Sequence, residues 1–274
     1  MKLTEQSKPK YPRILAENDT YRTPQFKKEK VLLSPTLSFF PRLFNIVINS
    51  GRLAKQGKYG PEEWVQSSID ILDALESSGI KIEVSGMNYL SSFEGPAVFI
   101  SNHMSTLETM ILPSIIQPIK EVTFVVKQEL INYPYFGHIL GARDPIVVGR
   151  SNPREDLMHV MNEGLKYIKN GRSIIIFPQR TRSSRFNSEH FNTLGVKLAK
   201  KAGCYVVPTA LVTDAWGNGR MIKDIGRIDP SKTVHFSFGK PLQVESTGAK
   251  EHLAVLDFIR EKLTAWGRED CIEK

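Results

Sequence analysis

The stretch PAVFISNHMSTLET, residues 96–109, runs from an apolar segment directly into a polar turn that contains His103 and Glu108. The apolar part is typical of a buried strand, and the part after it predicts a helix capped by Ser105. Ser105 and Glu108 form the SxxE pattern of a capping box, in which the glutamate accepts a hydrogen bond from the N–H of the capping residue. His103 therefore lies in a strand-to-helix loop, and the glutamate on the first helical turn can fold back toward it.

This histidine and glutamate together suggest acid–base chemistry. An imidazole with one ring nitrogen held by a carboxylate keeps the other nitrogen free as a base, and the carboxylate stabilises the imidazolium that forms. Such a base can deprotonate an alcohol, and since no serine or cysteine nucleophile stands out nearby, the alcohol would come from a substrate. The structural alternative is that Glu108 serves only as a helix cap. The histidines without a comparable setting are His138, His159, His190, His235 and His252.

Short β-branched and aromatic runs recur along the chain and alternate with helical patterns. This alternation predicts an α/β fold with a mostly parallel central sheet flanked by helices, in which ligands gather at the carboxyl ends of the strands. We expect strands at 81–86, 96–100, 122–126, 145–148, 173–177, 205–212 and 234–239, and helices at 61–77, 153–171 and 190–203.

The first 80 residues differ in character from this α/β domain, which we place at 81–274. Residues 1–30 are polar and rich in lysine and proline, so we expect them to be poorly ordered. Residues 31–80 predict a helical region whose most apolar part is interrupted by two prolines and an arginine, too often to span a bilayer. From Pro41 onward, an apolar helical stripe lies beside basic residues. It either lies in a membrane interface or packs against the rest of the protein.

The charge balance indicates an anionic partner. In the 274 residues, 37 Lys and Arg outnumber 29 Asp and Glu, which gives a formal charge of +8. An anionic membrane surface, an acidic carrier protein and phosphorylated small molecules all fit this charge, whereas nucleic acid is disfavoured because aromatic residues are not interleaved with the basic ones. The start of the chain lacks the apolar core of a secretory signal, so we expect a cytoplasmic, peripheral protein.

Cationic side chains follow three of the predicted strands. Lys127 comes after VTFVV and Arg150 after PIVVG, and SIIIFPQRTRSSR, residues 173–185, switches abruptly from an apolar strand to a basic, hydroxyl-rich turn. Guanidinium groups and hydroxyls at a strand's carboxyl end make a phosphate or carboxylate site, although a solvated basic turn is the structural alternative. The candidate binding residues of this turn are Gln179, Arg180, Thr181, Arg182 and Ser183.

Several of these segments resemble the motifs of the PlsC-like glycerolipid acyltransferases, a family that includes bacterial lysophosphatidic acid acyltransferase. NHMSTLE resembles the family's HxxxxD motif, with Glu108 where aspartate is usual, and FPQRTRS at 177–183 is similar to its FPEGTRS block. VVKQELINYPYFGHILGARDPIVVGR at 125–150 and VVPTAL at 206–211 are similar to the second and last blocks. The similarity covers roughly residues 80–240, in order.

The resemblance implies a reaction. It implies acyl transfer from acyl coenzyme A or acyl carrier protein to the free hydroxyl of a lysophospholipid, such as 1-acylglycerol 3-phosphate, to give phosphatidic acid. His103 would be the general base and Glu108 its orienting partner, with no acyl-enzyme and no cofactor other than the thioester donor. Lys127, Arg150 and the turn from Arg180 to Ser183 would hold the phosphate of the acceptor.

Besides Glu108, three positions depart from the family pattern. Gln179 replaces a glutamate, Arg180 replaces a glycine, and Gly149 replaces an aspartate before Arg150. These changes bear on the acceptor more than on the chemistry. An acyltransferase that uses glycerol 3-phosphate, a lipid A precursor or an aminolipid is therefore one alternative. A noncatalytic protein that binds anionic lipid is another.

Overall fold

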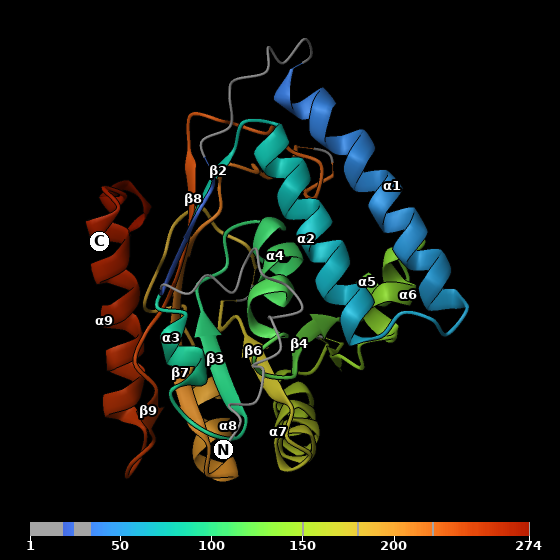
Figure 1. The fold of residues 1–274 in the computed structure, drawn as a ribbon. Coiled ribbons are helices and arrows are strands. Elements are labelled where there is room, and N and C mark those ends of the chain that lie inside the picture. Colours follow the sequence, from blue (N-terminus) through green and yellow to red (C-terminus); the bar gives the residue numbers. More distant parts are fainter. Residues whose placement is uncertain (1–18, 25–33, 150, 180, 221, 274) are drawn as a thin grey trace, which may run out of the picture.

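The computed structural model describes residues 19–24, 34–149, 151–179, 181–220 and 222–273. In this part of the chain a central sheet is covered by helices on both faces (Figure 1). Strand order in the sheet is β1-β2-β8-β7-β3-β6-β4-β5, and β9 pairs with β7 beside this path. The strands are β1 Thr20–Arg22, β2 Lys81–Ser85, β3 Ala97–Ser101, β4 Val122–Lys127, β5 Ile146–Val148, β6 Ser173–Ile176, β7 Tyr205–Val212, β8 Thr233–Phe238 and β9 Leu242–Gln243.

The predicted mostly parallel sheet is confirmed. Strand β3 lies in its middle, parallel to both β6 and β7, and every residue of β3 is buried. Ile100 lies opposite Ile176 on one side and Pro208 on the other, which fixes the register at the carboxyl edge. Strand β8 is antiparallel to β7 because the connection between them is a loop excursion without a crossover helix.

Helices α2 and α4 pack together on one face of the sheet, with α1 outside α2, while α7, α8 and α9 pack on the other face (Figure 1). The chain therefore forms three layers, and α4 is buried because it lies between the sheet and α2. The helices are α1 Pro35–Lys55, α2 Pro61–Ser77, α3 Asn88–Ser91, α4 Leu107–Ile116, α5 Gln128–Ile131, α6 Phe136–Gly141, α7 Pro153–Lys169, α8 Leu194–Ala202 and α9 Ala249–Ala265, followed by a 3-10 turn at Glu269–Cys271.

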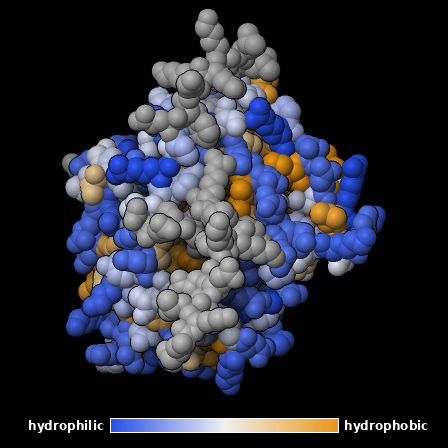
Figure 2. Space-filling view, viewed as in Figure 1, coloured by the Kyte–Doolittle hydropathy of each residue, from blue (hydrophilic) through white to orange (hydrophobic). Residues whose placement is uncertain are grey.

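Helix α1 begins before Pro41, where the sequence pattern first became helical. Its first residue is Pro35, which is tolerated there because the first helical N–H has no partner within the helix. The Ser34 side chain accepts a hydrogen bond from the N–H of Leu37 at 3.3 Å and caps the helix. One face of α1 is buried, but Leu37, Phe44 and Leu53 stay exposed. Figure 2 shows patches of apolar surface among hydrophilic ones in the region of α1.

Strand β1 was not expected from the polar sequence of residues 1–30. It pairs antiparallel with β2, so the edge of β2 provides hydrogen-bond partners for the backbone of β1. Its Tyr21 side chain is buried and donates a hydrogen bond of 2.6 Å to Glu76 of α2. Residues 1–18 and 25–33 lie outside the described part of the chain.

Searched across the described residues, the helices include none that is both long and apolar enough to cross a bilayer.

Candidate active site

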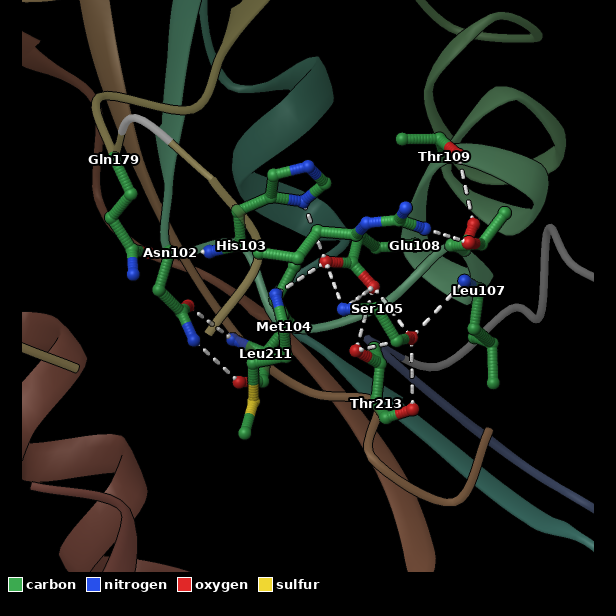
Figure 3. Close-up of polar contacts among 12 residues, drawn as sticks. Asn102, His103, Met104, Ser105, Leu107, Glu108, Thr109, Gln179, Leu211 and Thr213 are labelled. Atoms are coloured by element: carbon green, nitrogen blue, oxygen red, sulfur yellow. Dashed lines mark hydrogen bonds and ion pairs between the residues drawn. The ribbon is translucent and has the colours of Figure 1, made fainter. Parts of the chain in front are cut away.

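His103 and Glu108 meet in the loop between β3 and α4. The Nδ1 atom of His103 lies 2.8 Å from Oε1 of Glu108 (Figure 3). The histidine side chain keeps 19% of its surface exposed, whereas the glutamate is fully buried. The spacing of these two residues in the sequence predicted this contact, and the glutamate does fold back from the first turn of α4.

Glu108 is the centre of a buried hydrogen-bond network. Its carboxylate accepts hydrogen bonds from the backbone N–H groups of Met104 at 2.6 Å and Ser105 at 2.9 Å, and from the hydroxyl of Thr213 at 2.6 Å. Burial alone would raise the pKa of Glu108, but the hydrogen bond and charge of His103, with the hydrogen bonds from Thr213 and Ser105, outweigh burial and lower the pKa. Glu108 is therefore held as a carboxylate.

The helix starts one residue later than predicted. Thr106, not Ser105, is the residue before α4, and its side chain makes no capping bond. The Ser105 hydroxyl still accepts a hydrogen bond from the N–H of Leu107 at 3.1 Å, and the Glu108 half of the capping box is present as the bond from the N–H of Ser105. Ser105 is drawn into the network around the Glu108 carboxylate, whereas the Thr106 side chain bonds to Asp224 and Arg182 instead of capping the helix. Glu108 thus serves the helix start and the imidazole at the same time.

The turn after β6 grips the backbone of His103 from the other side. The N–H of His103 donates to Oε1 of Gln179 at 2.7 Å, and its carbonyl accepts from the N–H of Ser183 at 2.9 Å. Phe177 stacks on the imidazole with 4.3 Å between ring centroids. The FPQRTRS segment therefore lies directly beside the histidine, because β3 and β6 are parallel neighbours whose carboxyl ends meet at the same edge.

Asn102 fixes the loop to β7. Its side-chain amide donates to the carbonyl of Leu211 at 2.8 Å and accepts from the N–H of Leu211 at 3.0 Å. These two bonds continue the β3–β7 pairing past the last strand residue, so the backbone that carries His103 is anchored on both sides.

The predicted binding residues lie in different settings. Gln179 and Ser183 contact the backbone of His103, whereas Thr181 is exposed. Lys127 ends β4, the strand next to β6, and its ammonium lies 3.2 Å from the carboxylate of Glu129. Arg150 and Arg180 lie outside the described residues.

Arg182 is paired with a carboxylate that the sequence did not single out. Its Nη1 atom lies 2.5 Å from Oδ1 of Asp224 and also donates to the hydroxyl of Thr106. That hydroxyl in turn donates to Asp224 at 2.7 Å. The turn after β6, the loop after β3 and the excursion after β7 are thereby joined at one point.

The position of Thr213 is also fixed through the residue that follows it. Its neighbour Asp214 forms two bonds of 2.9 Å with Arg268 and one of 2.7 Å with Lys232. These bonds lower the pKa of Asp214, although burial alone would raise it. A polar cavity of about 610 Å³ borders this cluster, and none of its lining residues contacts His103 or Glu108.

The sequence reasoning missed Asn102, Thr213 and Asp224 as parts of the site. Thr213 directly follows the end of β7, so the rule that functional residues gather at strand ends would have pointed to it. Asp224 lies in an irregular loop and carried no such signal.

Comparisons with known proteins identify the family of the chain. Residues 81–212 match the family model described as Acyltransferase. The chain is 30% identical over 196 residues to the 1-acyl-sn-glycerol-3-phosphate acyltransferase of Pseudomonas aeruginosa, a match that covers 72% of this chain and 71% of that protein. It is also 29% identical over 142 residues to a chloroplastic 1-acyl-sn-glycerol-3-phosphate acyltransferase of Arabidopsis thaliana. This second match covers 52% of this chain and 38% of the Arabidopsis protein.

A solved structure shares the fold. The PlsC acyltransferase of Thermotoga maritima superposes with a TM-score of 0.65 at 18% identity, covering 84% of this chain and 94% of that one. The fold and the site define an α/β acyltransferase. The chain belongs to the PlsC-like glycerolipid acyltransferase family.

Proposed function

We propose that this acyltransferase moves a fatty acyl group from a thioester to the free hydroxyl of 1-acylglycerol 3-phosphate and so makes phosphatidic acid. The observation that carries the proposal is the 2.8 Å contact between Nδ1 of His103 and the buried carboxylate of Glu108. The names of the Pseudomonas and Arabidopsis relatives support the choice of acceptor.

His103 acts as the general base in the proposed reaction. Because Nδ1 donates its proton to Glu108, Nε2 is the nitrogen that takes the proton of the acceptor hydroxyl as its oxygen attacks the thioester carbonyl. The resulting imidazolium is stabilised by the carboxylate. When the tetrahedral intermediate collapses, the carbon–sulfur bond breaks and the leaving thiolate takes the proton from Nε2. The acyl group passes directly to the acceptor, and the step requires no metal or organic cofactor.

The phosphate of the acceptor binds beside the histidine. Arg182 lies next to Ser183, whose N–H bonds to the carbonyl of His103, and Lys127 lies at the same edge of the sheet. Arg150 and Arg180, which the sequence predicts as further phosphate ligands, lie outside the described residues. Gln179 replaces the family's usual glutamate with a neutral amide, which removes a negative charge from the place where the phosphate would bind.

The partners follow from charge and surface. The net charge of +8 suits an acidic acyl carrier protein or acyl coenzyme A as donor, and an anionic lipid surface on the cytoplasmic side as the place of work. Helix α1 is the part that contacts this membrane peripherally, because exposed apolar and basic side chains share its surface. The apolar ones are Leu37, Phe44 and Leu53, and the basic ones are Arg42, Arg52 and Lys55.

The test is an acylation assay of the purified protein with 1-acylglycerol 3-phosphate and either acyl coenzyme A or acyl carrier protein. We expect phosphatidic acid to form, and we expect His103→Ala to lower kcat by about 10³-fold without lowering the melting temperature. Turnover by His103→Ala at the wild-type rate would contradict the role of the histidine. Activity on other lysophospholipids but not on 1-acylglycerol 3-phosphate would contradict the proposed acceptor.

A second candidate keeps the chemistry but changes the acceptor. Gln179 and Arg180 replace the family's usual residues in the block that would face the acceptor. The acceptor of this second candidate is glycerol 3-phosphate, a lipid A precursor or an aminolipid. A panel of these acceptors in the same assay separates the two candidates by their kcat/KM values.

A further inference from the structure

Asp224 holds Arg182 by one corner of its guanidinium. In the part of the chain that the structure describes, Nη1 makes the bonds, to Oδ1 of Asp224 at 2.5 Å and to the hydroxyl of Thr106. Among the described residues, neither Nε nor Nη2 of Arg182 meets a hydrogen-bond acceptor, and the side chain keeps 17% of its surface exposed. The edge of the guanidinium that carries Nε and Nη2 is therefore fixed in place and left open.

This open edge is the part of an arginine that binds a phosphate through two parallel hydrogen bonds. A free arginine side chain loses rotamer freedom when it binds, whereas Arg182 has already been ordered by its partners and keeps only 17% of its side chain exposed. A carboxylate that competed with a phosphate ligand would occupy the open edge. Asp224 instead binds the opposite corner, so its geometry is that of a support.

Asp224 is itself held by the core. Its backbone carbonyl accepts a hydrogen bond of 3.1 Å from the indole N–H of Trp216. Trp216 is fully buried and packs edge-on against Phe39 and Phe40 of α1, with ring centroids 4.9 and 5.8 Å away. The excursion between β7 and β8 that carries both residues lies beyond residues 81–212, the part that matches the family model.

We infer that Asp224 is a positioning residue for acceptor recognition, which orients Arg182, with the help of Thr106, so that Nε and Nη2 receive the phosphate of the acceptor. The inference rests on the proposed function, since it takes a phosphate-bearing acceptor as the ligand. Thr106 lies between His103 and Glu108 in the chain, so the same contact sets the position of the phosphate relative to the imidazole. The excursion after β7 thus takes part in choosing the acceptor.

The test compares acceptor and donor kinetics in Asp224→Asn. This variant removes the charge but keeps the shape, so we expect the KM for 1-acylglycerol 3-phosphate to rise on the order of tenfold, with kcat and the KM for the acyl thioester unchanged. Thr106→Val, which removes only the hydroxyl, should raise the same KM. Asp224→Glu should restore part of the loss. The melting temperature of each variant shows whether it is folded.

The matched control is Asp229→Asn. Asp229 lies in the same excursion, but the hydrogen bonds of its carboxylate to described residues are those from the N–H and hydroxyl of Ser231. We expect all its kinetic constants to stay at the wild-type values. An unchanged acceptor KM in Asp224→Asn and Thr106→Val, or a loss of kcat alone, would overturn the inference.

The outcome is also separable from a failure of the proposed function. If the wild type does not acylate 1-acylglycerol 3-phosphate, the proposed acceptor is wrong. The rise in melting temperature with inorganic phosphate then tests the inference by itself. A larger rise in the wild type than in Asp224→Asn supports it, and equal rises overturn it.

Discussion

The loops that follow β3 and β6 lie side by side at the carboxyl edge of the sheet, but they satisfy their polar groups in different ways. In the first loop, the carboxylate of Glu108 is fully buried and takes hydrogen bonds from His103, Met104, Ser105 and Thr213. In the second, Arg182 is half-buried and, among the residues that the structure describes, is held through one nitrogen. The carboxylate of the first loop has its hydrogen bonds within the protein, whereas the guanidinium of the second keeps Nε and Nη2 for a ligand.

This difference separates chemistry from recognition. A buried, saturated carboxylate is organised before any substrate arrives and costs no reorganisation during the reaction, which suits the support of a base. An arginine with an open edge gains its remaining partners from the ligand, which suits binding. Substitutions in the network around Glu108 should therefore lower kcat, and those in the cluster around Arg182 should raise the acceptor KM.

The largest effect is expected from Glu108→Gln. The amide keeps the shape but loses the charge that stabilises the imidazolium, so kcat should fall by about 10³-fold or more while the acceptor KM stays within about twofold. Steady-state kinetics measure both constants. The control is Glu163→Gln on α7, which removes only an exposed ion pair with Lys166. A rise in KM at constant kcat would erase the contrast between the two loops.

The next effect is expected from Thr213→Val. This change removes the 2.6 Å hydrogen bond to Glu108 at a fully buried position, so it should lower the free energy of unfolding by about 1–3 kcal/mol and kcat by about tenfold. Urea unfolding and kinetics measure the two losses. Thr213→Ser keeps the hydroxyl and should recover most of both. If Thr213→Ser falls as far as Thr213→Val, the methyl group rather than the hydroxyl is what matters at this position.

A smaller effect should appear when the pH is lowered. The pKa of Glu108 is lowered by folding, so its stabilising contribution is fully present above the usual value of 4.5 and is lost as the pH falls through the folded value. The difference in unfolding free energy between the wild type and Glu108→Gln should therefore shrink below pH 4.5. Urea titrations of both proteins at several pH values measure this difference, and a constant difference would mean that the carboxylate is not held ionised.

The sequence predicted the local parts of this site and missed the distant ones. The loop of His103 and Glu108 follows from a strand, a capping pattern and a short spacing, all within one segment. Thr213 and Asp224 reach the same loop from the far end of β7, and nothing in local periodicity encodes which hydroxyl or carboxylate meets it. The sequence did not predict strand β1 for a similar reason, because a short polar segment becomes a strand only when the edge of β2 provides backbone partners.

The smallest effect is expected from Gln179→Glu, which restores the family's usual residue in the turn after β6. Glutamate can still accept the 2.7 Å hydrogen bond from the N–H of His103, so the backbone of the base should not move and kcat should stay unchanged. The added negative charge lies beside the acceptor phosphate and should raise its KM by about two- to fivefold, less at high salt. Gln243→Glu, the same charge change at an exposed position of β9, is the control. If Gln179→Glu lowered kcat instead, the turn after β6 would belong to the catalytic support as much as the loop after β3 does, and the two loops would no longer divide the work between them.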